Sequence, residues 1–293
     1  MSVAAYGFCE DLVPIRRLAA RLRLQVGVID VHRFPDGETL LTAPADASST
    51  VILYRSLHHP NERLVELLLA ADACRRAGAG RLVLVAPYLC YLRQDAVFEK
   101  GQSLSRDVVG GWLGRAFDRI VTVQAHVHRT AQLSDVFGVP CDNLSVAGAL
   151  ASLAAAGERL LVVGPDAESA PWAAAAAAQI GGEATTFRKR RLGDRQVELT
   201  LPSDTRFDGR AVLLLDDVCS SGGTLQRAIL QLRQAGAKSI DVAVAHALFD
   251  AETERRLVCA GARRIISSDS VPHPTNALAL DDVLASALKD EVC

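Results

Sequence analysis

The sequence predicts an α/β fold built on mainly parallel sheets, and two observations carry this prediction. Short runs of β-branched residues and leucine alternate along the chain with segments of helical periodicity. The runs are almost continuously apolar, which is typical of strands that are buried on both faces of a parallel sheet. With 293 residues, of which 49% are hydrophobic, the chain is long enough for two domains of ordinary size.

Six apolar runs are predicted as buried strands, and they cover residues 50–56, 81–88, 119–126, 159–166, 211–218 and 239–249. The segments 61–78 and 223–236 are predicted as helices that connect successive strands. The Ala-rich segment 171–182 reads as a further, tightly packed helix.

Two of these helix–strand units resemble each other. "LLAADACRRAGAGRLVLVAPYL" can be laid on "LQRAILQLRQAGAKSIDVAVAHAL", and both contain Ala-Gly-Ala, at 77–79 and at 235–237. The glycine is expected to end each helix and lead into the next strand. We therefore predict two similar domains, 1–147 and 148–293; the alternative is that any two helix–strand units share this texture.

Bulk properties exclude several classes of protein. The formal net charge is only −2, which argues against a general binder of nucleic acid or of membrane surfaces. No apolar run is long enough for a transmembrane helix, and Glu10 and Asp11 interrupt any signal-peptide pattern. The seven cysteines are scattered without a C-x-x-C pair, so we expect them to be reduced and the protein to be cytoplasmic.

One segment carries chemistry. The run "VLLLDDVCSSGGTL" ends an apolar strand in Asp216 and Asp217. A helix N-terminus presents N–H groups and partial positive charge, and glycine lets the backbone approach an anion. The small residues at the start of the next helix therefore predict a phosphate cradle, formed by Ser220, Ser221, Gly222, Gly223 and Thr224.

Carboxylates repel phosphate, so the paired acids need another ligand. They suit vicinal hydroxyls of a ribose, or a magnesium ion that is reached through water. A cradle for phosphate beside acids for hydroxyls predicts a site for a sugar phosphate such as ribose 5-phosphate. The alternative is an ordinary strand–turn–helix with a capped helix.

This loop resembles the phosphoribosyl-diphosphate (PRPP) binding loop of the type I phosphoribosyltransferase fold. The rest of the chain is similar to the ribose-phosphate diphosphokinase (PRPP synthetase) family, which uses that fold. Its motifs occur in the family's order: "FPDGETLL" (34–41), "PYLCYLRQD" (87–95), "FEKGQSLS" (98–105), "VTVQAHVHRT" (121–130), "VVGPD" (162–166) and "RKRR" (188–191). The resemblance covers nearly the whole chain, and the pattern PY-x-x-Y-x-RQD is highly specific.

The resemblance implies two phosphoribosyltransferase-type domains and a reaction. Ribose 5-phosphate attacks the β-phosphorus of Mg²⁺-bound ATP through its C1 hydroxyl, and the products are PRPP and AMP. Diphosphoryl transfer of this kind depends on positioning and on cations that neutralise spreading charge. The family also implies a homo-oligomer, a dimer or a hexamer of dimers.

Residue roles follow from the same resemblance. Lys189 and Arg191 match the pair that acts on the transferring phosphates. The expected ATP contacts are Arg93, Gln94, Asp95 and His126, together with the hairpin residues Phe34, Asp36 and Glu38 that reach a neighbouring subunit's ATP. His126 and Asp166 match residues linked to the metal.

The chain also differs from the family at several positions. Gln124 stands where an Asp is usual, Ser220 replaces a third acid of the loop, and Ala96 follows RQD in place of a basic residue. "PDAESAPWA" replaces a glycine-rich stretch. Two alternatives therefore stay open: a phosphoribosyltransferase or phosphotransferase of the same fold with another substrate, and a non-catalytic regulatory subunit.

Overall fold

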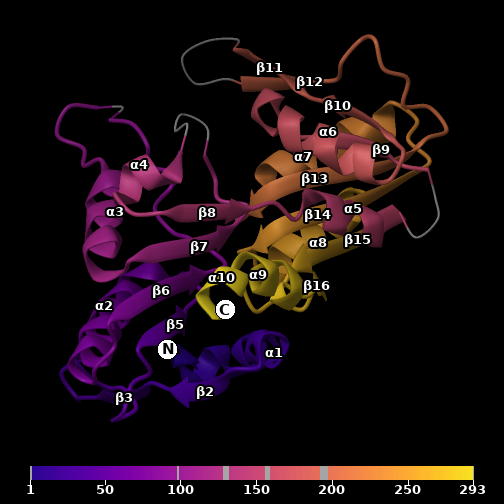
Figure 1. Ribbon diagram of the computed structural model, residues 1–293. Coiled ribbons are helices and arrows are strands. Elements are labelled where there is room, and N and C mark those ends of the chain that lie inside the picture. Colours follow the sequence, from indigo (N-terminus) through magenta and orange to yellow (C-terminus); the bar gives the residue numbers. More distant parts are fainter. Residues whose placement is uncertain (1, 98, 128–131, 156–158, 192–196, 293) are drawn as a thin grey trace. The chain divides into compact units, whose positions relative to one another are not determined.

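The chain folds into two units, each built around its own sheet. The computed structural model describes residues 2–97, 99–127, 132–155, 159–191 and 197–292 (Figure 1). Unit 1 comprises residues 1–144 and 279–293, and unit 2 comprises residues 145–278. The α/β prediction is confirmed, and no helix among the described residues has the length and apolar character to span a membrane.

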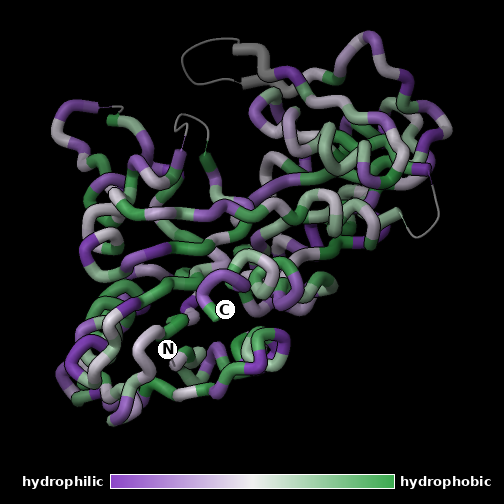
Figure 2. The backbone as a smooth tube through the Cα atoms, in the orientation of Figure 1, coloured by the Kyte–Doolittle hydropathy of each residue, from purple (hydrophilic) through white to green (hydrophobic). Residues whose placement is uncertain are grey.

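Unit 1 is organised by a six-stranded sheet in the order β2-β1-β5-β6-β7-β8, in which every pair is parallel. The strands are β1 (Val3–Gly7), β2 (Gln25–Val28), β5 (Thr50–Tyr54), β6 (Arg81–Ala86), β7 (Arg119–Val123) and β8 (Cys141–Leu144). A separate antiparallel hairpin is formed by β3 (Asp30–Arg33) and β4 (Thr39–Thr42). Figure 2 shows the central strands as predominantly hydrophobic, as burial on both faces requires.

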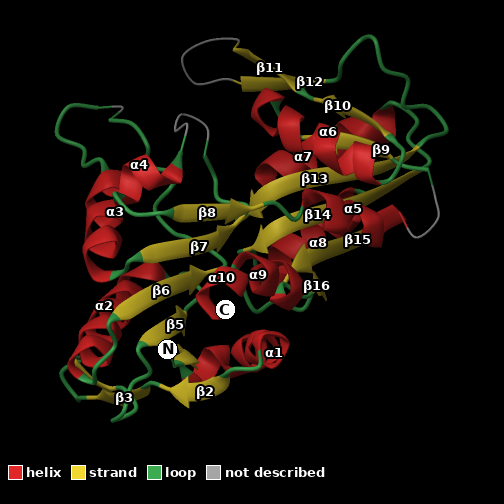
Figure 3. Cartoon of the chain, viewed as in Figure 1, coloured by secondary structure: helices red, strands yellow, loops and turns green. Residues whose placement is uncertain are grey.

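Helices flank this sheet. They are η1 (Cys9–Asp11), α1 (Leu12–Leu22), α2 (Pro60–Arg76), α3 (Ser105–Ala116), α4 (Leu133–Phe137), α9 (Asp281–Ala287) and α10 (Lys289–Val292). Helix α2 packs on α3, and α1 packs on α9 (Figure 3). The crossovers through α1 and α2 leave the sheet centre in opposite directions, which places the two helices on opposite faces.

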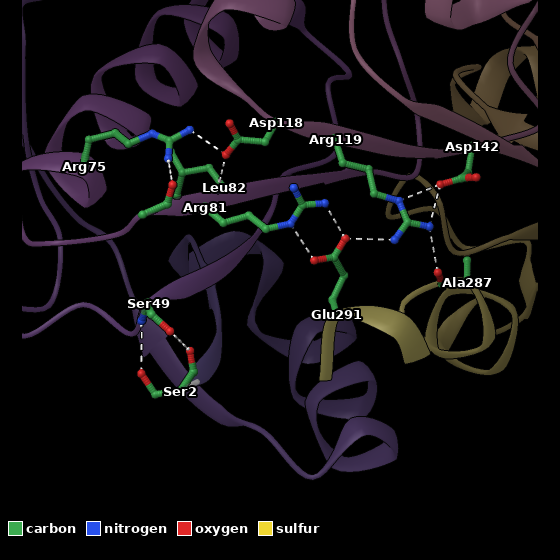
Figure 4. A network of polar contacts seen from close by, with 11 residues as sticks. Ser2, Ser49, Arg75, Arg81, Leu82, Asp118, Arg119, Asp142, Ala287 and Glu291 are labelled. Carbon is green, nitrogen blue, oxygen red and sulfur yellow. Dashed lines mark hydrogen bonds and ion pairs between the residues drawn. The ribbon is translucent and has the colours of Figure 1, made fainter. Parts of the chain in front are cut away.

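The C-terminal segment belongs to unit 1, whereas the sequence-based boundaries had assigned it to the second domain. Glu291 on α10 accepts two hydrogen bonds from Arg81, both at 2.8 Å, and a third from Arg119 at 2.9 Å (Figure 4). Arg21 on α1 also donates to Asp281 at 2.9 Å. These ion pairs join residues far apart in the sequence, so local sequence patterns did not indicate them.

Unit 2 repeats the architecture with a second six-stranded parallel sheet, ordered β10-β9-β13-β14-β15-β16. Its strands are β9 (Leu161–Gly164), β10 (Glu183–Thr186), β13 (Ala211–Cys219), β14 (Ser239–Ala247), β15 (Arg264–Ser268) and β16 (Asn276–Leu278). The pair β11 (Arg188–Arg191) and β12 (Val197–Thr200) forms a separate antiparallel ladder.

The helices of unit 2 are α5 (Ala147–Ala155), η2 (Ala167–Ser169), α6 (Ala170–Gln179), α7 (Gly223–Gln234) and α8 (Ala251–Ala260). Helix α7 is amphipathic, because its apolar residues recur at the spacing that puts them on one helix face. The buried residues of this face are Leu225, Ala228, Ile229 and Leu232. The Ala-rich α6 buries three alanines in the same way.

The two sheets share their topology, which supports the predicted duplication. Thr50 pairs with Arg81 in unit 1, and Ala211 pairs with Ser239 at the corresponding place in unit 2. Both helix C-termini use the predicted glycine in a left-handed conformation, with φ of 109° at Gly78 and 82° at Gly236. Counting along the strands from these pairs makes Arg55 the counterpart of Asp216.

Candidate active site

The paired acids lie where the topology of unit 2 favours a ligand. The chain leaves β9 toward β10 on one side, and β13 lies on the other side of β9. In such sheets the ligand binds at the carboxyl ends of the strands where the order reverses, because the two connections leave in opposite directions there. Asp166 follows β9, and Asp216 and Asp217 lie near the end of β13, so all three belong to this switch point.

Strand β13 carries the acids near its end and runs to Cys219, one residue beyond the predicted run 211–218. It pairs with β14 over Asp216, Val218 and Cys219. Pairing with β9 stops at Leu214, so the backbone of β13 beyond Leu214 has a neighbouring strand on one side only. Two backbone N–H groups in this part of the strand donate to the carboxylates of Asp216 and Asp217 instead. Asp216 Oδ1 accepts from the N–H of Asp217 at 3.0 Å, and Asp217 Oδ1 accepts from the N–H of Val218 at 2.7 Å.

Asp216 is held in an unfavourable electrostatic environment. Burial raises its pKa well above the ordinary value, and the neighbouring carboxylate of Asp217 raises it further. Asp166 adds to the repulsion from across the switch point. Carboxylates crowded in this way suit hydroxyl donors or a divalent cation.

The segment that is predicted to be a phosphate cradle lies at the start of α7. Gly222 is the N-cap residue with φ of 70°, a left-handed conformation that glycine adopts without strain. Among the described residues, no hydrogen bond is donated by the N–H groups of Ser221 and Gly222. Ser220 and Ser221 are exposed, while Gly223 and Thr224 lie in the first turn of the helix. These groups are arranged as an anion site requires.

Asp166 has a structural role that competes with a ligand role. Its Oδ1 accepts from the N–H groups of Glu168 at 3.1 Å and of Ser169 at 3.2 Å, which caps η2. The cap fixes the carboxylate at the carboxyl end of β9.

The predicted ATP residues of unit 1 follow two neighbouring strands. Arg93, Gln94 and Asp95 lie in the loop after β6, and His126 lies in the loop after β7. Strands β6 and β7 are parallel neighbours, so both loops leave the same edge of the sheet. Arg93 and Gln94 are exposed, and Asp95 and His126 are partly exposed.

Both loops contain strained backbone. Tyr91 has φ of 62° and Gln124 has φ of 41°, and neither is a glycine. Such conformations persist where the surroundings enforce them, and they cluster at functional sites. The N–H of Gln124 donates to the Leu144 carbonyl at 2.8 Å, and the N–H of Ala125 donates to Asn143 Oδ1 at 2.8 Å. Strand β8 thus positions the His126 loop.

The other predicted residues lie on two hairpins. Phe34, Asp36 and Glu38 are all exposed at the tip between β3 and β4, where the N–H of Phe34 donates to the Glu38 carbonyl at 2.8 Å. Phe34 is 41% exposed, so it is not a core residue. Lys189 and Arg191 belong to β11 by their backbone pairing, but their side chains lie outside what the structure describes.

No group of three or more His, Cys, Asp or Glu side chains in the described ranges forms a metal-binding set. Magnesium commonly keeps several waters and binds one or two carboxylates together with substrate phosphates, so the paired acids still fit it.

Two residues near these sites, Arg55 and Arg256, were not predicted from the sequence. No role was predicted for Arg55, whose buried side chain pairs with three acids at the switch point of unit 1. No residue of α8 was predicted either, although Arg256 contacts the predicted phosphate cradle. Counting from the Ala-Gly-Ala repeat places His58 opposite Asp216, so only the strand pairing identifies Arg55 as the counterpart, and no local signal pointed to Arg256.

Comparison with known proteins decides the family. The N-terminal domain of ribose phosphate pyrophosphokinase matches residues 13–116, and the phosphoribosyl transferase domain matches residues 144–277. The ribose-phosphate pyrophosphokinase of Methanopyrus kandleri is 34% identical over 279 residues, which cover 94% of each chain. The chain belongs to the ribose-phosphate pyrophosphokinase family.

Further ribose-phosphate pyrophosphokinases agree with this assignment. The one from Thermococcus kodakarensis is 32% identical over 255 residues, covering 86% of this chain and 89% of its own. A crystal structure of phosphoribosylpyrophosphate synthetase from Mycobacterium smegmatis is 24% identical and matches 99% of both chains with a TM-score of 0.85. That structure shares the fold, and the family inferred from the motifs is confirmed.

Proposed function

We propose that this chain is an active ribose-phosphate pyrophosphokinase, which transfers the diphosphoryl group of ATP to the C1 hydroxyl of ribose 5-phosphate. The products are PRPP and AMP. The observation that carries the proposal is the pairing of two crowded carboxylates with a glycine-containing helix N-terminus at one switch point. That pairing suits a ligand with hydroxyls at one end and phosphate at the other.

The residues of unit 2 would divide the sugar phosphate between them. The N–H groups and hydroxyls of residues 220–224 hold the 5-phosphate, since a helix N-terminus attracts negative charge. Asp216 and Asp217 accept hydrogen bonds from the ribose hydroxyls. Magnesium, when bound near these acids, supplies positive charge to the phosphates.

The residues of unit 1 would bind the nucleotide. Arg93, Gln94, Asp95 and His126 are proposed to contact ATP, and their place after adjacent parallel strands supports this. The exposed hairpin residues Phe34, Asp36 and Glu38 are proposed to reach the nucleotide of a second subunit. Lys189 and Arg191 would neutralise charge on the transferring group.

The reaction is tested by incubating the protein with ribose 5-phosphate, Mg²⁺ and ATP labelled at the γ-phosphate. AMP should accumulate, and the label should move to the sugar product together with the β-phosphorus. Ribose without its phosphate serves as the control substrate. Formation of ADP would indicate a simple kinase, and binding without turnover would support a regulatory subunit; either result overturns the proposal.

The basic strand gives a second test of the same proposal. Lys189→Ala and Arg191→Ala should each lower kcat by about 100- to 1000-fold, because they would meet charge that develops in the transition state. The KM values should change much less. A pure KM effect would assign both residues to ground-state binding instead.

We also propose that the protein is a homo-oligomer. Val65 and Leu69 on α2 and Val108 and Trp112 on α3 are exposed apolar residues, and the two helices border a hollow of about 370 Å³. Light scattering should report a multiple of the 31.2 kDa chain mass, and Trp112→Glu should reduce it. Val258→Glu, at an exposed position on α8, should not. A monomeric parent protein would refute the proposal.

A further inference from the structure

Helix α8 contacts the predicted phosphate cradle, residues 220–224, which is called the phosphate loop below. No residue of α8 was among those predicted to bind a ligand. Arg256 Nη2 donates to the carbonyl oxygen of Ser221 at 3.1 Å and to the hydroxyl of Thr253 at 2.8 Å. One guanidinium nitrogen therefore joins α8 to the residue that precedes the N-cap of α7. No sequence motif that was assigned to the site includes either Arg256 or Thr253.

The contact determines which way a peptide group faces. The carbonyl of Ser221 and the N–H of Gly222 belong to one planar trans peptide, so they point in opposite directions. Since Arg256 holds the carbonyl toward α8, the Gly222 N–H is directed away from α8. Among the described residues this N–H donates to no protein acceptor. It is thus available to an anion at the start of α7.

Two further contacts hold the loop in this orientation. A Cβ atom added to Gly222 would lie 2.5 Å from a methyl of Thr253, so the loop backbone lies directly against α8. The N–H of Leu248 donates to the Cys219 carbonyl at 2.8 Å. Thr253 is itself fixed, because it is buried and its N–H donates to Asp250 Oδ1 at 2.8 Å.

We propose that Arg256 is a positioning residue for the phosphate loop, and that it acts through the Ser221–Gly222 peptide without touching the substrate. The proposal rests on the proposed function, since it assumes that the loop binds the 5-phosphate of ribose 5-phosphate. Removal of Arg256 lets this peptide rotate and weakens phosphate binding, while ATP binding, assigned to unit 1, is unaffected.

The main test uses Arg256→Met, which retains an unbranched side chain but no donor. The expected result is a rise of about 5-fold in KM for ribose 5-phosphate, which corresponds to the net contribution of one ordinary hydrogen bond. The KM for ATP should stay within about twofold of the parent value. Arg256→Lys retains a donor and should recover part of the loss.

Two more variants separate positioning from simple charge attraction. Arg255→Met removes the neighbouring charge on α8 and serves as the matched control; within the described residues, Arg255 forms no hydrogen bond to the loop. It should leave both KM values unchanged. Thr253→Val keeps the charge of Arg256 but removes the hydroxyl that orients it, and should raise the KM for ribose 5-phosphate by about twofold.

Calorimetric titration with ribose 5-phosphate keeps the outcomes distinguishable. If the parent protein binds ribose 5-phosphate but makes no AMP, the proposed function fails and the same variants test Arg256 by affinity alone. Equal losses in Arg255→Met and Arg256→Met would show that only charge matters, and would overturn the inference. Unchanged affinity in Arg256→Met with an intact melting temperature would overturn it as well.

Discussion

Replacing Arg55 by methionine perturbs the most deeply buried cation of unit 1. Its side chain is 1% exposed, and its guanidinium donates to Glu10 at 3.0 Å, to Asp11 at 3.1 Å and to Glu66. The guanidinium carbon also lies 3.9 Å from the centroid of the Phe8 ring. The variant keeps an apolar stem of similar length but leaves the carboxylates without their shared cation.

The expected loss in the free energy of unfolding depends on which of the three acids are buried. The side chains of Asp11 and Glu66 are 3% and 2% exposed, whereas Glu10 is 49% exposed and can be solvated. Removing one partner of a buried ion pair typically costs about 3–5 kcal/mol, because the other charge remains uncompensated. Arg33 still pairs with Glu66 at 2.6 Å, so we expect the lower end, about 3 kcal/mol.

The stability that Arg55→Met loses should decrease as the pH is lowered. Burial holds the pKa of Asp11 above its ordinary value even though Arg55 lowers it, so removing Arg55 should raise that pKa further. A raised pKa means that the folded chain binds more protons than the unfolded chain, so stability increases as the pH falls toward the ordinary Asp value. The deficit of the variant is therefore largest at pH 8 and smaller at pH 5.

Differential scanning calorimetry of the full chain at both pH values measures this. At pH 8 the melting temperature of the affected transition should fall by about 10 °C. Arg76→Met is the matched control, since Arg76 pairs with Asp72 at side-chain exposures of 79% and 61%; it should cost less than about 0.5 kcal/mol. A deficit below about 1 kcal/mol, or one that does not change with pH, would refute the reasoning.

Three further predictions test the site and the C-terminal segment. Asp216→Asn should stabilise the ligand-free protein by about 1–2 kcal/mol while weakening ribose 5-phosphate binding, because it removes one of the crowded like charges. Calorimetry tests this, and a lower melting temperature contradicts it. Glu291→Gln should cost about 1–2 kcal/mol at pH 7 in urea unfolding. Because Arg81 lowers the pKa of Glu291, this stabilisation is present above the ordinary Glu value and is lost as the pH falls through the lowered pKa. The difference should therefore shrink as the pH is lowered from the ordinary Glu value, and a difference that does not change with pH contradicts the prediction. Gly222→Ala should raise the KM for ribose 5-phosphate about 10-fold or more, since the new Cβ would lie 2.5 Å from a methyl of Thr253 on α8. Gly209→Ala is the control, because Gly209 has a similar φ of 71° but no atom lies within 4 Å of the added Cβ. This control measures the cost of the backbone conformation alone and should leave KM unchanged.

The parts of the fold that could be predicted are those that burial dictates. Strands β5, β6, β7, β9, β13 and β14 are central, so both faces are covered and the sequence is continuously apolar. Edge strands gave no such signal. β10 and β16 are short and partly exposed, and their residues resemble those of loops.

The site was predictable to the extent that it is local. Residues 216–224 form one continuous segment whose composition predicts an anion cradle, and the acids of this segment lie at the switch point of the sheet. The strand itself was predicted to residue 218, but the hydrogen bonds that the carboxylates of Asp216 and Asp217 accept from the next backbone N–H were not. The contact of Arg256 with Ser221 crosses from one helix to another loop, and no local pattern encodes it.

The two switch points show how one architecture can serve two purposes. Arg55 and Asp216 occupy corresponding positions when residues are counted from equivalent pairs in the two sheets. In unit 1 the position carries a cation that Asp11 and Glu66 neutralise inside the fold, so the charges there are already matched. In unit 2 the carboxylate faces other carboxylates, and burial together with their repulsion raises its pKa. A fold that keeps such repulsion loses stability unless a ligand relieves it, and hydroxyl donors or a divalent cation would do so. The difference in charge between the two positions is therefore the reason to place the sugar-phosphate chemistry in unit 2 and to assign the Arg55 cluster to the stability of unit 1.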